Sequence, residues 1–186
     1  FWLYNKIRFQ EDLIDALCAR AVSEGWLTGE DTQKFVSTDR RELQDAIDES
    51  NIHGWLQGRI HDGEGRYAAL VTTLLQEDAN RLQTLKDVAF YTGKEKRTEV
   101  PTTAPEAFHQ LDNTLLNGMP CDQVMKVTES NPDKVVWEET QDLHSSFWNG
   151  QGAYYYDLRA ELIKGILADS GLTFKQTDTN RYEIIK

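Results

Sequence analysis

The sequence is poor in cysteine and proline, and it contains no long apolar run. Its two cysteines, Cys18 and Cys121, lie about a hundred residues apart, which excludes a disulfide-stapled fold and suits a reducing compartment. We therefore expect a cytoplasmic protein. Only four prolines interrupt a chain with 39% hydrophobic residues, so disorder is not expected. No run approaches the 18 apolar residues of a membrane helix, and we expect no membrane partner.

Positive charge is also scarce. Lysine and arginine total 20 against 31 aspartates and glutamates, which gives a net charge of −11. The field of such a chain repels polyanions, so nucleic acid is excluded as a partner. The one basic run, 94–97, is typical of a solvated loop.

The spacing of apolar residues predicts a helical region over 1–92. A helix is expected over 9–22, one or two helices over 28–47, and a loop at the glycine-rich 61–65. The longest periodic stretch, 66–89, predicts one long amphipathic helix. Its leucine-rich face is a candidate surface for a homodimer.

Residues 103–186 predict an α+β domain that binds a ligand, joined to the helical region by a polar linker over 92–103 or forming one compact unit with it. A helix from Pro105 to Gly118 is expected to precede a hairpin over 122–140. A helix over 153–169 and a hairpin over 172–186 then end the chain. The predicted fold class is thus α+β, with a helical N-terminal half and a small antiparallel sheet packed on helices.

The stretch Tyr154-Tyr155-Tyr156-Asp157-Leu158-Arg159 is the most informative feature of the chain. Adjacent helical side chains point about 100° apart, so three tyrosines cannot all enter one core. A guanidinium framed by aromatic rings suits an anionic or planar ligand. The predicted ligand-binding residues are Tyr155, Tyr156, Arg159, Trp148 and His144. The structural alternative is that the rings pack under the sheet while Arg159 pairs with an acid such as Glu138.

The sequence also allows two other kinds of chemistry. Cys121, His144 and Asp142 could meet as a nucleophile, a base and an orienting acid, although a buried thiol and a hairpin-end imidazole explain the same residues. Metal ligation could use Glu106 with His109, or a second set of residues, but solvated helix faces are the usual explanation. That second set is Glu49, His53, His61 and Glu64. We expect no metal site, and the sequence identifies no cofactor.

The order of helix, hairpin, tyrosine-led helix with Gly165-Ile166-Leu167, and final strand resembles the core of one superfamily. Its members are the vinyl-reductase-type small-molecule-binding domains, the transport-particle subunits and the heme nitric-oxide-sensing domains. The resemblance covers roughly the last 85 residues. It implies an α+β ligand-binding domain. In the heme sensors an axial histidine and a Tyr-x-Ser-x-Arg motif hold the cofactor, and His109 and Tyr155-x-Asp157-x-Arg159 occupy comparable places here, with Asp157 instead of serine.

The sequence therefore predicts a non-enzymatic, cytoplasmic small-molecule-binding or sensor domain with an aromatic and arginine pocket. One alternative is a small hydrolase that uses Cys121 or His144. The other is an acidic protein-interaction adaptor that uses the leucine stripe.

Overall fold

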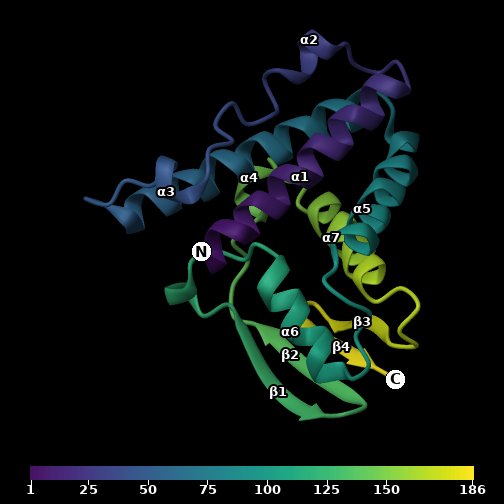
Figure 1. Cartoon of the computed structure of the whole chain (residues 1–186). Coiled ribbons are helices and arrows are strands. Elements are labelled where there is room, and N and C mark those ends of the chain that lie inside the picture. Colours follow the sequence, from purple (N-terminus) through teal and green to yellow (C-terminus); the bar gives the residue numbers. More distant parts are fainter.

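A computed structural model describes all residues, 1–186, as an α+β fold (Figure 1). The long helices α1, α4, α5 and α7 gather on one side, and the sheet lies on the other with α6 against it. The helices are α1 (Trp2–Ser23), α2 (Gly29–Thr32), α3 (Leu43–Ala46), α4 (Ile52–Glu77), α5 (Leu82–Lys96), α6 (Ala104–Thr114) and α7 (Ala153–Ile166). The strands are β1 (Met125–Asn131), β2 (Lys134–Glu139), β3 (Thr173–Asp178) and β4 (Arg181–Ile185).

The predicted C-terminal elements are confirmed. The two hairpins join through β2 and β4 into one antiparallel sheet of order β1-β2-β4-β3. Val135 and Trp137 face the helices together with their cross-strand partners Ile184 and Tyr182, as the two-residue period of a strand requires. Helix α6 begins with a capping box at Thr103, and its Phe108 ring packs 5.1 Å from Trp137.

The loop expected over 61–65 is wrong, because this stretch lies inside the 26-residue helix α4. Two glycines weaken a helix, yet here packing against α1 outweighs that cost. Gly63 is buried beside Gln10 and Glu11 of α1, and Arg66 forms a bidentate ion pair with Glu11.

The single long helix expected over 66–89 is also wrong. Asp78 adopts an extended conformation with φ −154° and ψ 108°, and its side chain accepts a hydrogen bond from the backbone of Asn80. It therefore ends α4 and starts a short 3₁₀ turn before α5. The leucines before and after Asp78 keep the three-to-four-residue spacing of one helix, so the spacing alone does not reveal the break.

The leucine stripe lies in the interior of the chain. Leu70, Leu74, Leu75 and Leu85 belong to a core cluster of 29 buried residues that also includes Trp137 of the sheet. The two halves of the sequence thus share one core. The face that suggested a homodimer is covered by the chain's own residues, so it offers no exposed apolar surface for that contact.

Helices α5 and α7 cross at a point where neither can carry a side chain. A Cβ built on Gly93 would overlap the carbonyl oxygen of Leu162, and one built on Gly165 would overlap that of Phe90. Gly93 falls within the expected polar linker 92–103, but α5 runs on to Lys96 and Thr92 is buried. The linker is therefore shorter than expected, because its first residues form a helix–helix contact.

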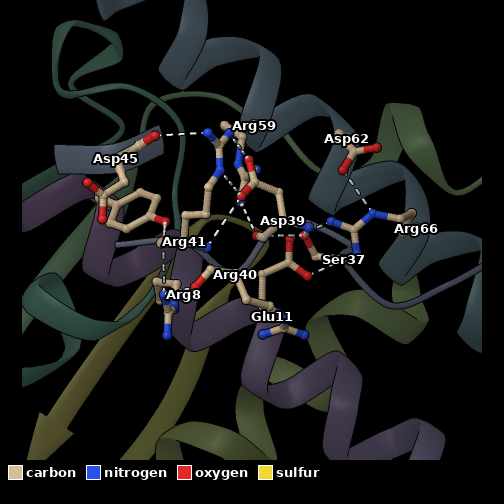
Figure 2. A network of polar contacts seen from close by, with 11 residues as sticks. Arg8, Glu11, Ser37, Asp39, Arg40, Arg41, Asp45, Arg59, Asp62 and Arg66 are labelled. Carbon is tan, nitrogen blue, oxygen red and sulfur yellow. Dashed lines mark hydrogen bonds and ion pairs between the residues drawn. The ribbon is translucent and has the colours of Figure 1, made fainter. Parts of the chain in front are cut away.

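Two helices, α2 and α3, form where one or two were expected over 28–47, but each has only four residues, and most of the segment 33–51 is irregular. Figure 2 shows how arginines of neighbouring helices hold it. Arg59 of α4 bonds both the carboxylate and the carbonyl of Asp39, and Arg66 bonds the carbonyl of Phe35. These side chains satisfy backbone groups that a helix would satisfy internally, which explains how a loop can lie against α1 and α4.

Candidate functional site

The loop between β2 and α7 turns the His144 side chain inward. The Asp142 carboxylate accepts hydrogen bonds from the backbone N–H groups of His144 at 2.9 Å and Ser145 at 3.0 Å. Partial burial would raise the pKa of Asp142, but bonds from Ser145, Tyr156 and His144 lower it well below its ordinary value. The charged form of Asp142 therefore stabilises the turn. The imidazole that follows is 1% exposed.

Three side chains surround the His144 ring. Nδ1 lies 3.1 Å from Glu64 Oε1 of α4, and Nε2 lies 3.1 Å from Asn117 Oδ1. The Tyr155 hydroxyl is 3.0 Å from Nε2, and the two rings stack with centroids 3.9 Å apart. Burial raises the pKa of Tyr155 well above its ordinary value, so this phenol stays neutral.

Asn117 links this cluster to Glu139. Its amide nitrogen donates to Glu139 Oε1 at 3.4 Å, which directs the amide oxygen at His144. Nε2 of His144 thus lies beside an acceptor, Asn117 Oδ1, and beside the Tyr155 hydroxyl, which can donate or accept, so the tautomer of the ring selects between these two partners.

Arg159 is paired inside the protein, as the structural alternative proposed, although with Glu139 in place of Glu138. Its Nη1 donates to Glu139 Oε1 at 2.7 Å, and both side chains are buried. Burial alone would lower the pKa of Arg159, but the charge of Glu139 raises it above its ordinary value. The rings of Tyr156 and Tyr182 lie 4.8 and 5.0 Å from the guanidinium and cover it.

The expected recess between the tyrosines and Arg159 is therefore filled. The cavity that touches both Tyr155 and Arg159 has a volume of only 30 Å³, enough for a water molecule and too small for an organic ligand. Trp148 is fully buried, with its ring 6.0 Å from Tyr155. Of the five predicted residues, Tyr155, Tyr156, Arg159 and His144 meet in one polar cluster, and Trp148 packs behind Tyr155.

A larger cavity lies on the other side of His144. It has a volume of 220 Å³, and we call it the Glu64 cavity. Helix α4, the connection from α6 to β1 and the 143–147 loop form its wall. The lining residues are Gln57, Ile60, His61, Glu64, Gly118, Met119, Asp122, Leu143, His144, Ser146 and Phe147.

Glu64 is the unusual residue of this cavity. It is 2% exposed, and its Oε1 pairs with His144. Its other oxygen, Oε2, is buried and has no hydrogen-bond partner within the protein. A buried carboxylate oxygen without a donor costs on the order of 1–3 kcal/mol, so its retention beside a cavity suggests a bound group that supplies the donor.

A second open cavity of 400 Å³ lies against Tyr156. Its acidic groups are already engaged, because Glu139 bonds Arg159 while Asp142 bonds the backbone of its own turn. Asn180 likewise donates to the Glu139 carbonyl. This cavity therefore contains no orphaned polar group that calls for a ligand.

The catalytic arrangement that the sequence left open is not formed. Both ring nitrogens of His144 bond other residues, Asp142 contacts the backbone of His144 and not its ring, and no hydrogen bond joins the exposed Cys121 to either. The hydrolase that would use Cys121 or His144 therefore stays a prediction.

The candidate metal ligands named from the sequence do not lie together in the structure. Glu106 caps α6 through Thr102 and Thr103, and His109 is exposed on the same helix. His61 and Glu64 share the Glu64 cavity, whereas Glu49 and His53 are exposed. No group of three or more histidine, cysteine, aspartate or glutamate side chains is placed to hold a metal ion.

Three important residues were not assigned to this site from the sequence. The sequence offered Glu64 only as a candidate metal ligand, and no pattern pointed to Asn117. Glu139 directly follows Glu138, the acid named as a possible partner of Arg159. A strand alternates its side chains between faces, so Glu139, two residues after Trp137 and on the same face, could have been selected over Glu138.

Comparison of the chain with protein-family models, with curated proteins and with solved structures finds no match. The superfamily resemblance of residues 103–186 therefore stays a prediction. No helix combines the length and the apolar character that crossing a membrane requires.

Proposed function

We propose that this protein is a small-molecule-binding domain whose ligand occupies the Glu64 cavity. One observation carries the proposal: a buried carboxylate, Glu64, borders a 220 Å³ cavity with one oxygen that no protein group bonds. Ligand sites commonly combine an apolar wall with a few polar groups that fix orientation. Ile60, Met119, Leu143 and Phe147 supply the wall here.

The size of the cavity supports a ligand of modest dimensions. An apolar cavity of about 150 Å³ holds a benzene molecule, so this one accepts a single ring with a short substituent. The terminal torsion of a glutamate is broad. Oε2 exposes almost no surface in the structure, so the Glu64 carboxylate must rotate about this torsion to bond a guest, and the rotation moves Oε1 relative to His144 as well.

The arrangement favours binding over catalysis. A general base needs a free nitrogen or oxygen within reach of its substrate, but the two nitrogens of His144 bond Glu64 and Asn117. The hydrolase alternative would need that ring to be released. The adaptor alternative keeps the acidic net charge in its favour, but its leucine stripe is buried. A cytoplasmic location remains a prediction from cysteine usage.

The proposal is tested by screening a library of single-ring fragments by NMR, with backbone amide shifts of the ¹⁵N-labelled protein as the readout. We expect fragments to shift the amides of residues 60–64, 118–122 and 143–147 together. Ser146→Trp fills the mouth of the cavity from an exposed position and should abolish these shifts.

Ser23→Trp, at the exposed end of α1, is the matched control and should leave the shifts unchanged. If no fragment perturbs the cavity residues, or if Ser146→Trp and Ser23→Trp behave alike, the proposal is wrong.

A further inference from the structure

The chemical class of the ligand follows from the charges around the Glu64 cavity, and this step rests on the function proposed above. We infer that the site selects a small organic cation: an ammonium group that donates to Glu64, attached to a compact hydrocarbon body.

The lining contains two carboxyl groups, those of Glu64 and Asp122, and no lysine or arginine. His61 and His144 are the remaining titratable side chains. The buried guanidinium of Arg159 is neutralised by Glu139, and that of Arg66, on the same helix as Glu64, is paired with Glu11. The lining therefore carries two acidic side chains and no permanent cation.

The two carboxyl groups have unused acceptor capacity. Glu64 Oε2 has no partner, and Asp122 uses Oδ2 to accept the backbone N–H of Met119 at 2.8 Å. An ammonium group carries three donors and no acceptor, so it suits a site whose free groups are acceptors. An anion would face the same two carboxyl groups with no lysine or arginine in the lining to offset them, and the net charge of −11 repels it further.

The apolar part of the lining defines the rest of the ligand. Phe147 stands edge-on to the ring of His61, with centroids 4.8 Å apart, at the exposed side of the cavity. Ile60, Met119 and Leu143 provide aliphatic surface. A hydrocarbon ring can pack against these residues while its charged group points at Glu64, and a cation near Phe147 gains from the ring face.

The test uses three probes of one shape that differ in charge: benzylamine, benzyl alcohol and benzoate. Binding is measured by the NMR shifts of the cavity amides at pH 7. A hydrogen bond to a charged group makes benzylamine bind at least about tenfold tighter than benzyl alcohol, and benzoate should bind weakest. Tighter binding of benzyl alcohol or benzoate would overturn the inference while leaving the proposed function intact. Absence of binding by all three probes would also overturn it, and the fragment screen then decides the proposed function separately.

Two substitutions locate the preference. Glu64→Gln should remove most of the advantage of benzylamine, whereas Glu95→Gln, an exposed glutamate with no ion pair, should not. Because Glu64 is buried, a variant that leaves the core undisturbed is also needed. Ser146→Lys places a cation at the mouth from an exposed position and should weaken benzylamine and strengthen benzoate, while Ser23→Lys should do neither. Equal effects of Ser146→Lys and Ser23→Lys would contradict the inference.

Discussion

Substituting Glu139 by glutamine removes the only acidic partner of Arg159 while keeping the shape of the side chain. In the wild type, Arg159 Nη1 lies 2.7 Å from Glu139 Oε1, and the two side chains are 8% and 6% exposed. The variant leaves a guanidinium charge buried beneath Tyr156 and Tyr182 with no counter-charge. If Arg159 is a structural residue, this change must cost stability, whatever ligand is present.

The expected cost is large for a conservative change. Breaking a buried ion pair by removing one partner costs about 3–5 kcal/mol, because the other charge stays desolvated. The amide of glutamine can still accept one hydrogen bond, so we expect about 3 kcal/mol for Glu139→Gln. The neighbouring Glu138 pairs with Arg181 at 3.0 Å on the surface, and Glu138→Gln should cost below about 1 kcal/mol.

The assay is urea unfolding at pH 7, followed by tryptophan fluorescence and by far-UV circular dichroism. The free energies are compared between variants whose denaturant slopes agree. The double variant Arg159→Met with Glu139→Met should lie closer to the wild type than Glu139→Gln does, because both charges are removed together. Equal and small effects of Glu139→Gln and Glu138→Gln would refute the view that Arg159 is held for structure.

Further predictions concern packing, thiols and acid stability. Gly165→Ala should destabilise the protein by about 3 kcal/mol, because the new methyl group meets the backbone of α5. Gly58→Ala, at an open helical position, should instead stabilise it by about 0.5–1 kcal/mol. Urea unfolding measures both free energies, and similar effects of the two substitutions would contradict the close crossing of α5 and α7. A thiol reagent should label the exposed Cys121 in the native protein and reach Cys18 only after unfolding, since burial raises the pKa of Cys18 to about 11. Rapid labelling of both cysteines in the native protein would contradict the buried position of Cys18. Asp142→Asn should cost about 1 kcal/mol at pH 7. The pKa of Asp142 is lowered on folding from its ordinary 3.8, so its stabilisation is complete above that value and decreases as the pH falls below it; a cost as large at pH 2 as at pH 7 would argue against the charged turn.

Local signals predicted the C-terminal half well. Thr103 and Pro105 start α6, and the turn at 130–133 and Gly171 separate elements that the structure confirms. These features depend on a few neighbouring residues, so a sequence carries them directly. The N-terminal half depends on contacts between distant residues: α4 continues through Gly63 because α1 packs against it, and nothing within 61–65 announces that contact.

The site was predicted only in part, because it too depends on contacts between distant residues. The tyrosine-led helix correctly drew attention to His144, Tyr155 and Arg159, which meet in one cluster. What the sequence could not show was their partners, because Glu64 lies 80 residues before His144 along the chain. Glu139 fills the expected recess around Arg159, and Glu64 lines the cavity that lies beside His144.

A crystal structure of the protein soaked with benzylamine tests the central claim most directly. We expect electron density for the ring against Phe147, with the ammonium nitrogen within hydrogen-bond distance of Glu64 and with His144 still bonded to the same carboxylate. A cavity filled by the side chains of Phe147 and Met119, with benzylamine absent or bound elsewhere, would contradict the account.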